Sequence, residues 1–136
     1  MNDVTFANPS VPILLQILSG AKSAQDLVPA GSIYGLTHGN VVELTIPAGA
    51  AGGPVSLSSI LSFKLLNSCR QHAVHLHGHT FYVVRSAGNS TYNYDNPILR
   101  DVVSIGSSGD EVTIRFVADN PGPWFFHCHI NWHLNL

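Results

Sequence analysis

The sequence contains few charged residues and few cysteines. Only 10% of its 136 residues are charged, six of them basic and eight acidic, so the net charge is −2 with neutral histidines. This balance argues against nucleic acid or an anionic membrane as a partner, because either would need a basic surface. Two cysteines, Cys69 and Cys128, are too few for the disulfide framework of a small secreted domain.

Long hydrophobic runs are also absent. No apolar run approaches the roughly 20 residues that span a bilayer, so we expect no transmembrane helix. The short apolar stretch 11–18 follows Asp3 and no basic residue, which is unlike a signal peptide. We therefore expect the chain to begin inside a longer protein. Its length suits one domain, and its 45% hydrophobic content predicts a globular one.

The sequence does contain a repeated pattern of short strands and turns. Alternating, β-branched or aromatic residues predict strands at 41–46, 80–85, 102–105, 111–117 and 124–130. Turn residues separate them, most clearly in the Asp-Asn-Pro-Gly-Pro segment at 119–123. The pattern predicts an all-β sandwich or barrel. Only Val55–Gln71 fits neither a strand nor a helix.

The histidines gather in two clusters. The first contains His72, His75, His77 and His79, and the second contains His127, His129 and His133 around Cys128. Residues i and i+2 of a strand share a face, so His75 and His77 are expected to point the same way. By the same rule, His127 and His129 share one face, and Cys128 projects from the other.

These residue types suit copper. A thiolate with two imidazoles forms the trigonal site of a blue-copper centre, and Cys128 with His133 provides two of those ligands. The paired imidazoles on the opposite face suit a second, nitrogen-rich copper site. Zinc fits less well, because a closed structural site needs four ligands from one cluster. His79 is expected to support the ligands by hydrogen bonding, and no role is assigned to His38 or Cys69.

At this point the sequence resembles the C-terminal cupredoxin domain of fungal laccases, which are multicopper oxidases. The resemblance rests on the segments VPILLQILSGAKSAQDLVPAGSIY, HLHGHTFYVVRSAG, YNYDNPILRDVVS, NPGPWFFHCHI and WHL. It covers nearly the whole chain apart from residues 55–71. It implies that residues 1–136 form one plastocyanin-like domain, an all-β, cupredoxin-like Greek-key β-sandwich that lacks its last strand.

The resemblance also implies a role for each residue of the two clusters. The implied ligands are His72, Cys128 and His133 for the type 1 copper, His75 for the type 2 copper, and His77, His127 and His129 for the type 3 pair. The substrate's electron would enter through His133 and pass on through Cys128. The implied cofactor is copper, with up to four ions in the full-length enzyme.

The implied activity is the one-electron oxidation of phenols or aromatic amines, coupled to the reduction of O2 to water. The implied setting is extracellular, in lignin degradation by secreted enzymes. The remaining ligands of the three-copper cluster would come from an N-terminal cupredoxin domain that this chain lacks, so we expect the fragment alone to be inactive. Asn89-Ser90-Thr91 is an N-glycosylation sequon, which is compatible with secretion.

The segment 55–71 is interpreted as an insertion. Deleting it joins Pro54 to His72 and restores the family's Pro-His-x-x-His-x-His pattern. We therefore hypothesise a retained intron or a gene-model error, with a natural loop insertion as the alternative. A spliced message that still encodes these residues would refute the intron hypothesis.

Other functions remain open at this stage. A single-domain blue-copper electron carrier would use only His72, Cys128 and His133 and would bind one copper. A non-catalytic relic would bind none. Ascorbate oxidase and ferroxidase are further possibilities within the family, although a ferroxidase needs acidic residues near His133, where Asn131 offers no carboxylate.

Overall fold

The computed structural model describes residues 9–20, 33–48 and 73–129. Within these ranges the elements are α1 (Ile13–Leu18), β1 (Val41–Pro47), β2 (Ala73–Leu76), β3 (Phe81–Arg85), β4 (Ile98–Arg100), β5 (Val102–Ser104), β6 (Glu111–Val117) and β7 (Phe126–Cys128). The proposed insertion at 55–71 lies outside the described residues, as do His72 and His133.

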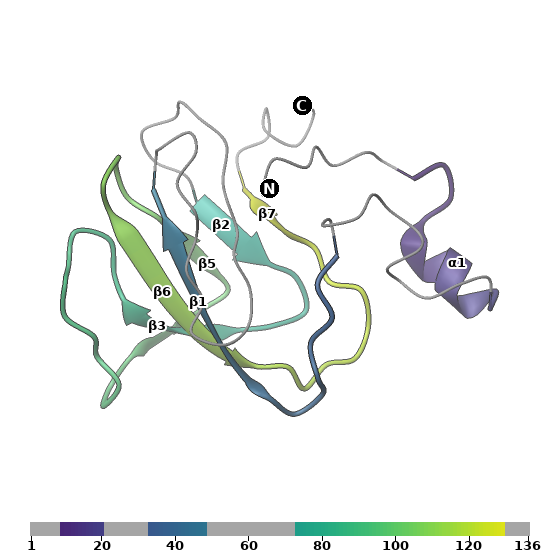
Figure 1. Cartoon of the computed structure of the whole chain (residues 1–136), viewed down its shortest axis with the longest axis horizontal. Coiled ribbons are helices and arrows are strands. Elements are labelled where there is room, and N and C mark those ends of the chain that lie inside the picture. Colours follow the sequence, from purple (N-terminus) through teal and green to yellow (C-terminus); the bar gives the residue numbers. More distant parts are fainter. Residues whose placement is uncertain (1–8, 21–32, 49–72, 130–136) are drawn as a thin grey trace.

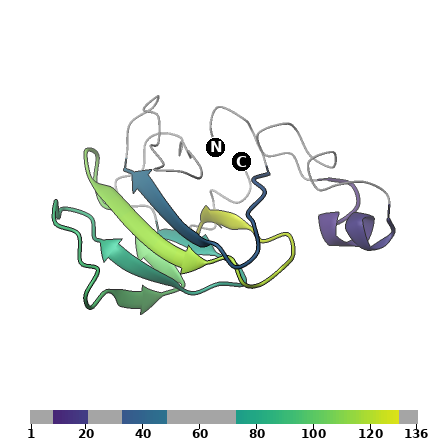
Figure 2. The same cartoon turned by 60° about the horizontal axis from the view of Figure 1, so that its bottom comes forward.

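The strands form two antiparallel sheets (Figure 1). One has the order β1-β6-β3-β4 and the other the order β5-β2-β7. In Figure 2 the blue β1, the green β6 and the teal β3 run side by side in one layer, and the yellow β7 belongs to the other. Apart from β3 and β4, neighbouring strands are not consecutive in sequence, because the chain passes repeatedly from sheet to sheet. This is the predicted all-β, cupredoxin-like sandwich.

The hydrophobic core lies between the two sheets. Alternate residues of the strands point into it, and the buried side chains are Val42, Leu44, Ile46, Ala48, Val74, Leu76, Phe81, Ile105, Val112, Ile114, Phe116 and Ala118. Burying a large aliphatic or aromatic side chain of this kind stabilises a fold by about 1.5–3 kcal/mol. The core therefore fixes which face of β2 is turned away from it, and that face carries the histidines.

Helix α1 lies apart from both sheets in the two views (Figures 1 and 2). None of its six residues is buried, and Leu18 is 73% exposed. The strand-and-turn pattern of the sequence does not predict this helix. No helix within the described residues has the length and apolar character that a membrane crossing requires.

Candidate metal centre

The pairing of β2 with β7 brings the two histidine clusters together. The strands are antiparallel, and the opposed pairs are Val74 with Cys128, His75 with His127, and Leu76 with Phe126. Residues directly opposite each other on antiparallel strands have their side chains on the same face. His75 and His127 therefore share one face of the sheet.

The backbone ladder continues past both ends of this pairing. The His77 N–H donates to the Phe125 carbonyl at 2.9 Å, and the His129 N–H donates to the Ala73 carbonyl at 2.7 Å. Strand β2 stops at Leu76, so His77 lies in the following turn and not in the strand that the i, i+2 argument assumes. The extra hydrogen bonds nevertheless keep His77 and His129 next to the paired histidines.

Four imidazole rings gather on this face of the sheet. The ring centroids lie 4.7 Å apart for His75 and His77, 5.0 Å for His77 and His127, 5.5 Å for His75 and His129, and 5.8 Å for His127 and His129. The i, i+2 spacing predicts each pair separately, and only the family resemblance implies that His77, His127 and His129 belong to one site. The structure shows that both pairs form one cluster.

Cys128 lies on the opposite face of the same strand. Its partner Val74 is fully buried in the core, so the half-buried Cys128 projects toward the core side of the sheet. One strand thus presents a thiol on one side and imidazoles on the other. The predicted partners of this thiol, His72 and His133, lie outside the described residues.

Two of the imidazoles have their tautomer fixed by backbone carbonyls. The Nδ1–H of His75 donates to the Asp101 carbonyl at 2.6 Å, and the Nδ1–H of His127 donates to the Cys128 carbonyl at 2.8 Å. A carbonyl oxygen only accepts hydrogen bonds, so in each ring the proton sits on Nδ1. Nε2 keeps its lone pair, which is the arrangement seen in metal-binding histidines.

Asp101 is well placed to orient His75. It is the single residue between β4 and β5, at the point where the chain passes from the four-stranded sheet to the three-stranded one. Its carbonyl also accepts a hydrogen bond from the Leu76 backbone at 3.4 Å. Sequence reasoning could not find this contact, because every residue type has a backbone carbonyl.

The Nε2 atoms of His77 and His127 lie 2.9 Å apart. Because Nε2 of His127 carries the lone pair, His77 is the donor in this hydrogen bond. With metal–nitrogen bonds of about 2.0–2.1 Å, two nitrogens bound at a right angle to one ion also lie roughly 2.9 Å apart. The separation of the two nitrogens is therefore that of two ligands of one metal ion.

The pKa of His77 is lowered from its usual value of 6.5. Desolvation is the largest cause, although the residue is exposed overall, and the charges of His75, His127 and His129 add to it. Several imidazolium ions in one cluster would repel each other. The neutral imidazole, which is the form that binds metal, is therefore favoured.

The cluster is open. Among residues 9–20, 33–48 and 73–129, no three His, Cys, Asp or Glu side chains form a group that could hold a metal ion by themselves. The imidazoles instead present a convergent pair of nitrogens, with two further rings beside it. The imidazole face therefore supplies some of the ligands of a metal site and does not surround the metal by itself.

His79 lies next to the cluster and makes the predicted kind of supporting contact. Its Nδ1–H donates to the carbonyl of His77 at 3.2 Å. Its ring packs edge-on against Phe116 and Trp124, with centroids 5.4 and 5.9 Å away. His38 is separate from the cluster, and its Nε2 hydrogen-bonds to the Asp119 carbonyl at 3.3 Å.

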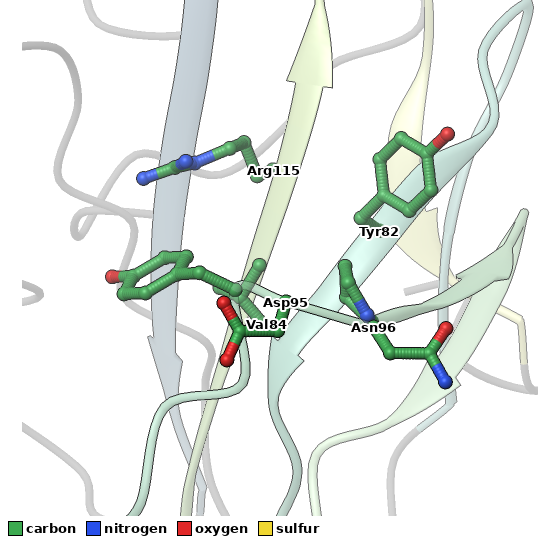
Figure 3. A pocket seen from close by; sticks show the side chains of 7 residues that line it. Tyr82, Val84, Asp95, Asn96 and Arg115 are labelled. Carbon is green, nitrogen blue, oxygen red and sulfur yellow. The ribbon is translucent and has the colours of Figure 1, made fainter.

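A pocket of about 410 Å³ lies on the four-stranded sheet (Figure 3). Its lining residues are Tyr82, Val84, Tyr94, Asp95, Asn96, Pro97 and Arg115. The guanidinium of Arg115 stacks over the ring of Tyr94 at 4.5 Å and donates two hydrogen bonds to the Glu43 carboxylate, at 2.6 and 3.0 Å. No histidine of the cluster lines this open pocket, so it is not part of the metal centre.

The sequence of this chain is similar to those of known proteins. A sequence model of the multicopper oxidase family matches residues 6–136. The chain belongs to the multicopper oxidase family. Membership implies copper as the cofactor, and the imidazole and thiol donors described above are the ligand types that copper prefers.

The most similar relatives of this multicopper oxidase chain include fungal laccases. It is 59% identical to a laccase of Phlebia radiata over 134 residues, 57% identical to a laccase of Pycnoporus cinnabarinus over 136 residues, and 54% identical to laccase-2 of Pleurotus ostreatus over 137 residues. The matches cover 98–100% of this chain but 22–23% of each relative. The chain therefore spans less than a quarter of the length of these relatives.

Proposed function

We propose that this chain is the C-terminal copper-binding domain of a laccase. The full-length enzyme would oxidise phenols or aromatic amines by one electron at a time and reduce O2 to water. The observation that supports this most directly is the geometry of β7. Cys128 lies on the core side of that strand, and His127 and His129 join the imidazole cluster beside it.

Each candidate ligand has a proposed role. Those for the type 1 copper are His72, Cys128 and His133, that for the type 2 copper is His75, and those for the type 3 pair are His77, His127 and His129. His133 would receive the substrate's electron. When bound, copper supplies the one-electron redox chemistry that the protein's side chains lack.

The contribution of the chain itself is to connect and orient the two faces. Cys128 is adjacent to His127 and His129 in the chain, so the covalent route between the thiol and either imidazole crosses a single peptide bond. Asp101 orients His75, and the Cys128 carbonyl orients His127. These contacts hold the Nε2 lone pairs toward the cluster before any metal binds.

The other half of the cluster would come from an N-terminal domain. The four imidazoles in this face cannot complete the coordination of three copper ions, and the chain spans only 22–23% of the laccases it matches. We therefore propose that O2 reduction needs that second domain. By family resemblance, we also propose that the full-length protein is secreted.

A single-copper electron carrier is the main alternative. It would need the thiol and its two histidine partners, but it would have no use for imidazoles on the opposite face of β7. The rings of His75, His77, His127 and His129 form one cluster, in which neighbouring ring centroids lie 4.7–5.9 Å apart. This cluster favours the oxidase. An inactive relic would be distinguished by its failure to bind copper.

The proposed function can be tested in a chimera. Residues 1–136 would replace the matching segment of the Phlebia radiata laccase, which is 59% identical. We expect the chimera to bind copper and to consume O2 when given 2,6-dimethoxyphenol. The isolated chain should consume none. A version that lacks residues 55–71 would test at the same time whether this segment disturbs the neighbouring His72.

Three variants of the chimera make the test specific. Cys128→Ser and His75→Ala should each abolish O2 consumption, whereas His38→Ala should leave it unchanged because His38 lies outside the cluster. If the chimera without these substitutions takes up one copper per chain but consumes no O2, the result would support the electron carrier instead. No copper uptake by a folded chimera would support the relic.

We also propose that Asn89 carries an N-linked glycan. The residue is exposed, and its Oδ1 accepts a hydrogen bond from the Thr91 backbone at 2.9 Å, which forms a compact Asx turn within the sequon. Mass spectrometry of the secreted chimera should find the glycan on the peptide that contains Asn89. Thr91→Ala, which keeps the turn, should remove it. An unmodified Asn89 in secreted protein would contradict the proposal.

A further inference from the structure

The turn that carries His77 is fastened to the loop that leads into β7. His77 itself lies beyond the end of β2, which has four residues, and β7 has three. Such short strands leave the relative position of His77 and His127 poorly fixed by sheet pairing alone. The hydrogen bond from the His77 N–H to the Phe125 carbonyl joins the turn 77–80 to the loop 118–125, and further contacts between these two segments add to it.

Asn120 and Trp124 provide two of these contacts. The Asn120 side-chain amide donates to the carbonyl of Gly78 at 2.9 Å. The Trp124 indole N–H donates to the backbone carbonyl of Asn120 at 2.7 Å. The two hydrogen bonds form a short chain from the turn to the loop, and Trp124 lies three residues before His127.

The indole ring also packs directly on the turn. Gly78 has φ of +71°, a left-handed conformation that favours glycine, and a Cβ atom at this position would overlap the Trp124 ring. The absence of a side chain at Gly78 therefore lets the indole lie against the backbone. Close packing of this kind restricts how far the turn can move relative to the loop.

His79 makes further contacts with the turn and with the aromatic side chains next to it. Its Nδ1–H donates to the His77 carbonyl at 3.2 Å, while its ring is wedged against Phe116 and Trp124. It thereby connects the backbone of a candidate ligand to the aromatic side chains beneath it. We refer to Gly78, His79, Asn120 and Trp124 as the turn clamp.

We propose that Asn120, Trp124 and His79 are positioning residues for the histidine-bound copper. They hold the Nε2 atoms of His77 and His127 in metal-binding geometry before copper arrives, so less ordering is required on binding. This inference rests on the proposed function, because it assumes that copper is the ion bound. It makes no assumption about substrate.

The test uses Asn120→Ala in the laccase chimera. Asn93→Ala is the matched control, since the Asn93 amide also donates to a backbone carbonyl at 2.9 Å, but in the loop before β4. Two quantities would be measured on purified protein. They are the affinity of the histidine-bound copper, from competition with a chelator, and the visible absorption band of cysteine-bound copper.

We expect Asn120→Ala to weaken the histidine-bound copper by roughly tenfold, which is the lower end of the effect known for partners of metal ligands. The cysteine–copper band should be unchanged, and Asn93→Ala should alter neither quantity. A general loss of stability would instead diminish both kinds of copper together. Unchanged affinity in Asn120→Ala would overturn the proposal.

A second pair of variants tests His79 through rescue. The side-chain amide of asparagine can occupy the position of the imidazole Nδ1–H, so His79→Asn should retain the copper affinity that His79→Ala loses. Equal losses in both variants would show that the hydrogen bond to His77 has no positioning role. If the chimera binds no copper before any substitution is made, the proposed function is refuted. That result is distinct from a failure of the turn clamp, in which copper binds but Asn120→Ala has no effect.

Discussion

The Nε2 atoms of His77 and His127 lie 2.9 Å apart, although 50 positions separate the two residues in the chain. They approach because β2 and β7 pair and because the turn after β2 is held against the loop before β7. The separation matches that of two nitrogens bound at a right angle to one ion, roughly 2.9 Å for ordinary metal–nitrogen bonds.

The two rings should bind the same copper ion. His77→Ala and His127→Ala in the chimera should each lower the affinity of the histidine-bound copper by at least about tenfold, since each removes a ligand. The fold loss of copper affinity in the double variant should be much smaller than the product of the fold losses in the two single variants. A chelator competition on all four proteins measures this coupling. Strictly additive free-energy losses would mean that the rings serve different ions.

Gly78→Ala should destabilise the fold more than Gly88→Ala. Both glycines have φ near +70°, so the backbone strain of about 1 kcal/mol is common to the two variants. Only at Gly78 would the new Cβ overlap a side chain, that of Trp124. This overlap should add roughly 1–3 kcal/mol.

Denaturant unfolding of the chimera, followed by a probe in this domain, measures both free energies. If the two variants lose the same free energy of unfolding, the indole does not pack on Gly78 in solution.

The phenol of Tyr94 should ionise above its usual pKa of 10.0. Burial is the largest cause, followed by the charge of the Glu43 carboxylate, to which the hydroxyl also donates. Glu43→Gln should therefore lower the pKa of Tyr94. Glu111→Gln should not, because Glu111 pairs with Arg85 instead.

A spectrophotometric titration of tyrosinate, with Tyr94→Phe to assign the signal, follows this shift. The raised pKa means that the folded state favours the neutral phenol. Its contribution to stability is therefore complete below about pH 10 and is lost as the pH rises through the folded pKa. A Tyr94 that titrates at or below the pH of an unfolded tyrosine would contradict the influence of the Glu43 carboxylate on its hydroxyl.

Much of the fold follows from residue patterns alone. Strand β6 has the bounds predicted for it, Glu111–Val117, because its apolar residues alternate and turn residues flank it. Strand β7 begins later than predicted, at Phe126. Trp124 and Phe125 are apolar, which favours a strand, but Trp124 is occupied in packing against Gly78 and hydrogen-bonding to Asn120. A tertiary contact of this kind leaves no trace in local sequence.

The candidate site was predictable to a similar extent. The i, i+2 spacing of the histidines correctly places His75 with His77 and sets Cys128 opposite His127. Spacing alone says nothing about the distance between the two clusters, which depends on the β2–β7 register. The supporting role of Asn120 was missed, because in the segment 119–123 it is typical of a turn residue, and only its contact with Gly78 identifies it. The interpretation of residues 55–71 stays a prediction.

The central claim is that one strand presents two different copper sites on its two faces. The most direct test is Cys128→Ser in the chimera, measured by total copper content together with the visible absorption band of cysteine-bound copper. The account predicts that the band disappears while the copper bound by His75, His77, His127 and His129 remains. If a folded Cys128→Ser protein loses the histidine-bound copper as well as the band, or if the band survives, the claim of two separate copper sites is contradicted.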